Sequence, residues 1–283
     1  MDVIATSGIK KANALREVLG LNMFQPVNVY DACTKLEVDV RFVAINMEGT
    51  YVSNDDPTKS SILLSALRPF PRKVFTCAHE LGHHQFGHGL KIDMIHEEND
   101  KKSDDDCEER LADIFASALL MPIAGIQFEF KRRNWDIKTA TPIQFFTISS
   151  VFGVGYRTLI YNCSLNKLIS YTKSNELSKY SPSDFLNKIF KGKQKAGHLK
   201  IIDSKYVENT VDTEVSGFLY LPKTVELEGC HLESIATTSN GVCYQMKQPG
   251  ILRANDAVNG QTYFIRIQNF EYIGLSEYRH LET

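Results

Sequence analysis

Apolar residues recur along this chain at two different spacings. Spacings of three and four residues, which place side chains on one face of a helix, predict helices over 9–19, 26–36, 75–89, 109–122 and 143–152. Alternation of apolar and polar residues, rich in Val and Ile, predicts strands over 38–45, 50–53 and 60–67. After residue 201, short alternating runs separated by glycine-containing turns predict strands at 217–221, 241–246, 263–267 and 270–275. The pattern predicts an α+β protein whose last part is rich in strands.

The same pattern divides the chain into four predicted parts. Residues 1–135 hold the first helices and a small sheet, and residues 136–172 have a helix-turn-helix layout around Gly153 and Gly155. Residues 173–200 are typical of a linker, because lysine and glycine residues gather toward their end. Residues 201–283 are predicted to form a separate β-rich domain.

Composition and charge narrow the class of protein. The 283 residues are 43% hydrophobic and 23% charged, and the formal net charge of −2 gives no overall field toward nucleic acid or membranes. No apolar stretch approaches the ~20 residues that span a bilayer, and the first residues, with the acidic Asp2, hold no apolar run that resembles a signal peptide. The six cysteines are scattered without a C-x-x-C pair, which is typical of a reducing compartment. We therefore expect a cytoplasmic protein without a membrane partner.

The clearest chemical motif is H-E-x-x-H, formed by His79, Glu80 and His83. On a helix, two histidines four residues apart lie on one face and can bind one Zn²⁺. Glu80 follows the first histidine and would lie beside the metal, where it can take a proton from the attacking water. The alternative interpretation is a polar helix face with two solvated histidines.

A zinc site that cleaves peptide bonds needs a third protein ligand and an open position. His88 is one candidate, but it follows His83 by five residues, whereas H-E-x-x-H-x-x-G-x-x-H requires six. Glu109 is the other candidate, at the start of a predicted helix, where a solvated glutamate favoured by the helix dipole is the alternative. Asp113 lies one turn further on the same face, where it could orient the ring of His79 or His83.

Several motifs between residues 9 and 126 carry a family resemblance. They are Pro26-Val27 before a short helix, the strand at 38–45, Arg68-Pro69, FTCAHELGHH at 75–84, and E-x-x-A-x-x-F-A-x-x-L-L-M-P at 109–122. In these motifs the chain resembles the ImmA/IrrE family of zinc metallopeptidases, which are intracellular bacterial proteins. The resemblance implies a small gluzincin-like peptidase domain, in which His79, His83 and Glu109 bind Zn²⁺ and Glu80 is the catalytic base.

The resemblance also implies a kind of substrate. Members of the family typically cleave a regulatory protein, often a helix-turn-helix transcriptional repressor, and so switch on a stress, DNA-damage, mobile-element or defence response. We expect a repressor encoded nearby as the substrate, and a β-rich sensor domain at residues 201–283 that binds single-stranded DNA or a small-molecule activator. The alternative is a non-enzymatic DNA-binding regulator with a structural metal site. Glu80 disfavours this alternative, because a structural site has no need of it.

An acidic stretch connects the two predicted ligand helices. The stretch from Asp93 to Glu109 contains nine acidic residues, these two included, which is typical of a solvated loop. Cys107 stands near the predicted start of the second helix, where the helix N-terminus lowers thiol pKa values. It is therefore a candidate inhibitory fourth ligand of the zinc, with an ordinary free cysteine as the alternative.

Candidate nucleic-acid contacts lie in the middle of the chain. Arg157 is on the second helix of the helix-turn-helix layout, and the basic residues Lys191, Lys193 and Lys195 lie in the predicted linker. That second helix has few cations and several apolar residues that need burial, Leu165 among them. Packing on the peptidase part is therefore favoured over docking on DNA.

Overall fold

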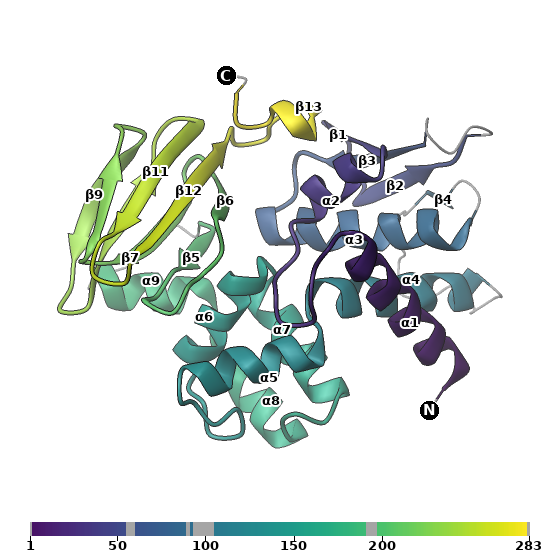
Figure 1. The fold of residues 1–283 in the computed structure, drawn as a ribbon, viewed down its shortest axis with the longest axis horizontal. Helices are drawn as coiled ribbons and strands as arrows, with labels where there is room; N and C mark the ends of the chain where they lie inside the picture. The colour runs from purple at the N-terminus through teal and green to yellow at the C-terminus, as the bar shows by residue number, and fades with distance from the viewer. Residues whose placement is uncertain (1, 55–59, 89–90, 93–104, 191–196, 282–283) are drawn as a thin grey trace. The chain divides into compact units, whose positions relative to one another are not determined.

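The computed structural model describes residues 2–54, 60–88, 91–92, 105–190 and 197–281 (Figure 1). Its contacts divide the chain into two compact units. The first comprises Met1–Gly125 and Glu271–Tyr278, and the second comprises Ile126–Phe270 and Arg279–Thr283. Both units combine helices with β-sheet, which confirms the predicted α+β class.

A mixed sheet forms one layer of the first unit, with the strand order β13-β1-β3-β2-β4. β1 (Asp39–Val43) runs parallel to β3 (Ser61–Ser65), and β2 (Gly49–Val52) is antiparallel to β3. These are the three strands that alternation predicts in this part of the chain, each within a few residues. β4 (Lys91–Ile92) pairs with the other side of β2, so β2 is not the last strand of the sheet.

The helices of the first unit cover the sheet and one another. They are α1 (Val3–Val18), α2 (Val29–Lys35), α3 (Phe70–Phe86) and α4 (Asp105–Leu120). α3 packs on β2, β3 and α4, and α1 packs on α4. α1 starts earlier than its apolar pattern predicts, because the side chain of Asp2 accepts a hydrogen bond from the backbone of Ile4 and caps the helix.

The end of the chain returns to the first unit. A strand is predicted over 270–275 within the β-rich domain, but the structure has only β13 (Gly274–Leu275), antiparallel to β1. The ring of Tyr272 packs edge-on against Phe42 of β1, with centroids 5.9 Å apart, and its hydroxyl donates to the carbonyl of Leu275 at 3.1 Å. These apolar residues therefore serve the sheet of the first unit, a partner that a local pattern does not identify.

The helices of the second unit follow α4 in the chain. They are α5 (Ile123–Arg132), which begins in the first unit, α6 (Pro142–Phe152), α7 (Tyr156–Leu165), α8 (Tyr171–Leu177) and α9 (Pro182–Phe190). α6 and α7 have the predicted helix-turn-helix order, with the turn at Gly153 in the left-handed region at φ +67°. Leu159 and Ile160 of α7 are buried, whereas Leu165, which we expected to be buried, is exposed.

Two four-stranded sheets complete the second unit. One has the order β5-β7-β10-β9 and the other the order β6-β12-β11-β8. The strands of the first sheet are β5 (Leu199–Ile201), β7 (Phe218–Pro222), β9 (Leu232–Thr237) and β10 (Gly241–Met246). Those of the second are β6 (Thr210–Glu214), β8 (Val225–Glu228), β11 (Gly250–Asp256) and β12 (Gln261–Gln268).

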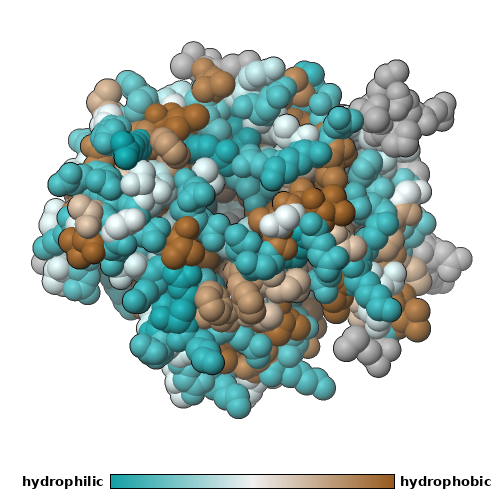
Figure 2. All heavy atoms as spheres, viewed as in Figure 1, coloured by the Kyte–Doolittle hydropathy of each residue, from teal (hydrophilic) through white to brown (hydrophobic). Residues whose placement is uncertain are grey.

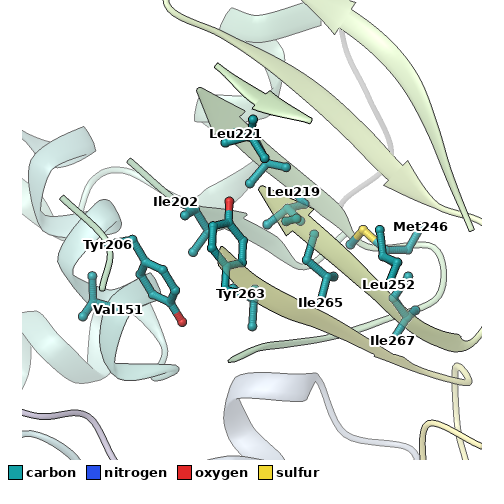
Figure 3. Packing of buried hydrophobic residues seen from close by; sticks show 13 residues of the cluster. Val151, Ile202, Tyr206, Leu219, Leu221, Met246, Leu252, Tyr263, Ile265 and Ile267 are labelled. Carbon is teal, nitrogen blue, oxygen red and sulfur yellow. The ribbon is translucent and has the colours of Figure 1, made fainter. Parts of the chain in front are cut away.

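The core of the second unit lies between these sheets (Figure 3). Leu219 and Met246 come from one sheet, and Leu252 and Ile265 come from the other; all four are buried in one hydrophobic cluster. Val151 of α6 belongs to the same cluster. Helix and sheet therefore share this core.

The packing divides the middle of the chain differently from the predicted boundaries. The predicted linker at 173–200 contains α9 and most of α8, and Leu177, Phe185 and Leu186 within it are buried. The hydroxyl of Ser150 on α6 accepts a hydrogen bond from the backbone N–H of Ile201 on β5 at 3.0 Å, across the predicted boundary. The lysine and glycine content of this stretch predicts a linker. The prediction is wrong for 173–190, because apolar residues between the lysines are buried in the second unit.

One helical stretch among the described residues, Cys107–Arg132, is long and apolar enough to cross a membrane by length and composition. Charged residues at both of its ends interrupt the apolar pattern, so an unbroken run is not seen in the sequence. Phe115 and Leu119 within it are fully buried, which accounts for its apolar character. On the face shown in Figure 2, hydrophilic residues predominate and hydrophobic residues form small separate groups.

Candidate metal centre

The H-E-x-x-H motif lies on α3, as its spacing predicts. The helix begins after Pro69, and Gly87 ends it in the left-handed conformation with φ +68°. His79 and His83 are four residues apart on one face, and their rings contact each other edge-on with centroids 4.9 Å apart. Their Nε2 atoms are 3.1 Å apart, so both imidazoles point to one place.

α4 brings a carboxylate to the same place. The Oε2 atom of Glu109 lies 3.1 Å from Nε2 of His79, and its Oε1 atom lies 3.5 Å from Nε2 of His83. The ligand atoms of these three residues all lie within 4.8 Å of one another. Of the two candidates that the sequence leaves open for a third ligand, the structure brings Glu109 rather than His88 into this cluster.

The three side chains fit a tetrahedral metal ion. In a tetrahedral zinc site with bonds of about 2.1 Å, ligand atoms lie about 3.4 Å apart, close to the separations in this cluster. Two imidazoles and one carboxylate are also a donor set that Zn²⁺ accepts in catalytic sites. The side chain of His83 is only 1% exposed, whereas that of Glu109 is 36% exposed. The cluster is therefore closed on the helix side and open beside Glu109, which leaves room for a fourth ligand.

Opposite charges are paired within the cluster. Burial alone would lower the pKa of His79, but hydrogen bonds to Asp113 and Glu109 outweigh it and raise this pKa to about 10. Burial alone would raise the pKa of Glu109, but its hydrogen bonds to His79 and His83 outweigh burial and hold this pKa well below its usual range. The carboxylates around His79 thus favour a positive charge at this place. In the metal-free protein the proton on His79 supplies it, and a bound divalent cation would replace that proton.

Each imidazole has a partner on its outer nitrogen. Nδ1 of His79 lies 2.9 Å from Oδ1 of Asp113, one turn after Glu109 on α4, as the sequence predicts. Nδ1 of His83 lies 2.8 Å from Nδ1 of His88. The sequence offered His88 as a candidate third ligand. In the structure it instead contacts the nitrogen of His83 that faces away from the ligand cluster. The left-handed glycine after the helix is the sequence signal that could have indicated this return.

Glu80 lies on the buried side of α3. Glu80 is only 1% exposed, and its negative charge helps to raise the pKa of His79. One turn further along that side, Nδ1 of His84 lies 3.1 Å from the hydroxyl of Tyr51, which ties the helix to β2. A buried carboxylate beside the cluster is suited to accept and return a proton.

Other residues predicted for the site lie elsewhere. Cys107 is near the start of α4 as expected, but it is exposed and does not belong to the cluster of ligand atoms found among the described residues. Arg157 lies on α7 in the second unit, where it lines a groove of about 460 Å³ between α7 and α8. Lys191, Lys193 and Lys195 lie outside the described residues.

Comparison with known proteins agrees with this geometry. Residues 33–164 match the family model Peptidase_M78, described as the IrrE N-terminal-like domain. The matched stretch is a little under half of the chain and holds all three residues of the metal cluster. The match confirms the resemblance to the ImmA/IrrE family and supports a metallopeptidase of that type. The IrrE N-terminal-like domain covers the metal cluster and extends through α6 and α7. A search of the curated proteins finds no match.

Proposed function

We propose that this protein is a zinc endopeptidase that cleaves a regulatory protein inside the cell. The observation that carries the proposal is the convergence of His79, His83 and Glu109, with Glu80 buried beside them. The two imidazoles and the Glu109 carboxylate would hold Zn²⁺, and the exposed side of Glu109 leaves access for a peptide. When bound, zinc supplies Lewis-acid polarisation of the scissile carbonyl and of water.

The protein's own residues then manage one proton. Glu80 takes it from the attacking water and returns it to the nitrogen of the departing amine. Its burial supports this role, since a carboxylate fixed beside the cluster needs no reorganisation before it acts. Asp113 keeps Nε2 of His79 directed to the metal through its bond to Nδ1.

The substrate and the response belong to the proposal as well. We infer a helix-turn-helix transcriptional repressor encoded nearby as the substrate, from the family to which the peptidase domain belongs. Its cleavage would switch on a stress, DNA-damage or mobile-element and defence response in the cytoplasm. To the β-rich part of the second unit, which packs two sheets around the hydrophobic cluster that includes Leu219 and Ile265, we assign the binding of an activator, single-stranded DNA or a small molecule.

The alternative is a DNA-binding regulator with a structural metal. Its support is the groove between α7 and α8, where Arg157 lies beside the exposed tyrosines Tyr161 and Tyr171. A structural site, however, makes no use of a buried glutamate that follows the first ligand. The peptidase is therefore the better supported function.

Co-expression with the neighbouring small helix-turn-helix protein tests the proposal. Wild type and Glu80→Gln are compared, the partner is analysed by mass spectrometry, and the zinc content of each purified enzyme is measured. We expect one cut in the partner with wild type, an intact partner with Glu80→Gln, and equal zinc in both. Cleavage that persists in Glu80→Gln at equal zinc content would contradict the proposed mechanism.

A further inference from the structure

The end of α3 returns the chain toward the metal cluster. Gly87 adopts φ +68°, a conformation that L-residues with a side chain rarely take, and open space surrounds the position of a Cβ there. The backbone N–H of His88 donates to the carbonyl of His83 at 3.0 Å. The backbone geometry of the helix terminus thus places His88 next to His83.

The two rings meet through their Nδ1 atoms. These atoms lie 2.8 Å apart, which is a hydrogen-bond distance, and the ring centroids are 5.0 Å apart. Nε2 of His83 faces Nε2 of His79 and the carboxylate of Glu109, so it is the atom that meets the metal. A metal-binding imidazole carries its proton on the other nitrogen. His83 therefore donates from Nδ1, and Nδ1 of His88 accepts.

Aromatic packing holds the acceptor in place. The ring of His88 is stacked on Phe86, with centroids 5.7 Å apart and an angle of 20° between the planes. Phe86 in turn contacts Phe115 of α4 edge-on at 6.1 Å. The ring that faces His83 is thus fixed by the same helix that supplies Glu109 and Asp113.

We propose that His88 is a positioning residue, which fixes the tautomer and the orientation of His83 for metal binding. It does for His83 what Asp113 does for His79, with an imidazole in place of a carboxylate. A neutral acceptor orients the ring without adding a negative charge to a site where the carboxylates of Glu80, Glu109 and Asp113 already lie in or beside the cluster. This inference rests on the proposed zinc site, and its test does not require the substrate.

The test is zinc affinity, measured by competition with a chromophoric chelator on the full chain. His88→Phe keeps an aromatic ring for stacking on Phe86 but removes the acceptor. His88→Asn loses the ring but keeps an oxygen near the position of Nδ1. We expect about 10- to 100-fold weaker zinc binding in His88→Phe, the usual cost of removing an outer partner, and recovery of most of the affinity in His88→Asn.

Three outcomes separate the possibilities. Wild-type affinity in His88→Phe, or equal losses in His88→Phe and His88→Asn, would overturn the positioning role while leaving the zinc site intact. Absence of stoichiometric zinc binding in the wild type would overturn the proposed function and this inference together. Thermal melting of the metal-free variants shows whether each one folds, and the visible spectrum of the Co²⁺-loaded protein reports a changed ligand geometry without reference to catalysis.

Discussion

A Cβ atom on Gly82 of α3 would lie 3.1 Å from the Cα atom of Ala112 of α4. The ring of Phe115 would lie equally close to it. Such distances are shorter than most Cβ contacts, so even one added methyl group would have to displace its neighbours, and the two helix backbones lie close together at this level. Glu109 lies one turn before Ala112, and this close approach allows its short side chain to reach both histidines of α3.

We predict that Gly82→Val separates α3 from α4 and weakens the metal site. Overpacking of a closed contact costs about 1–3 kcal/mol of unfolding free energy, and displacement of Glu109 lowers zinc affinity in addition. Gln85→Val is the matched control, since it places the same β-branched residue on the same helix at a half-exposed position. Chemical denaturation and zinc titration of both variants check this. Equal zinc affinities in the two variants would show that the contact does not set the site.

We predict that zinc binding near neutral pH releases about one proton, because the metal must displace it from His79. The pKa of His79 is raised to about 10 in the cluster, so its ring is protonated before zinc arrives, while Glu109 is already ionised. Calorimetry in two buffers with different ionisation enthalpies measures the release. Zinc binding by the wild type without proton release near neutral pH would contradict the raised pKa of His79.

The same pKa has a consequence for the metal-free protein. A folded-state pKa of about 10 against an ordinary value of 6.5 means that His79 stabilises the fold fully below pH 6.5. This stability is lost as the pH rises through 10. We therefore expect the unfolding free energy of metal-free protein to fall over this window, and to fall less in His79→Gln. Denaturation at several pH values, after treatment with a chelator, tests it.

We predict that Asp212→Ala destabilises the second unit strongly. Asp212 is buried on β6, where Arg266 donates to it at 2.5 and 2.9 Å and Arg279 donates at 2.8 Å. Burial raises the pKa of its carboxyl, but these two arginines outweigh burial and hold it well below the usual range. Removal of one partner from a buried ion pair costs about 3–5 kcal/mol, because the remaining charges stay buried.

The control for Asp212 is Glu233→Ala, which removes an exposed ion pair with Lys247 in the same unit. Such pairs contribute about 0–1 kcal/mol, so this variant should melt close to wild type. Calorimetric melting of both variants measures the difference. Similar melting of the two would show that the buried network contributes little.

We expect Cys107→Ser to leave zinc affinity unchanged. Its thiol is exposed and outside the cluster of ligand atoms, unlike Glu109. Glu109→Ala is the comparison, since loss of one of three ligands should weaken zinc binding by several orders of magnitude. A clear drop in the affinity of Cys107→Ser would instead restore the hypothesis of an inhibitory fourth ligand.

The sequence by itself determined the elements that are local. The four-residue spacing of His79 and His83 needs only a helix to place both rings together, and a helix is what the apolar pattern predicts there. Strands β1 to β3 follow equally from alternation, because a strand with one buried face has a period of two. The place of Asp113 behind His79 follows once Glu109 is on the same helix.

Only the tertiary structure decided which distant segments meet. Whether His88 or Glu109 completes the cluster depends on the closeness of α3 and α4, which two small residues in different helices, Gly82 and Ala112, set together. The return of β13 to β1, and the burial of helices inside a lysine-rich stretch, depend in the same way on long-range packing. An apolar pattern indicates that a surface is buried, but it does not identify the segment that covers it. The reason is that the hydrophobic effect depends on the apolar area removed from water and is not directional.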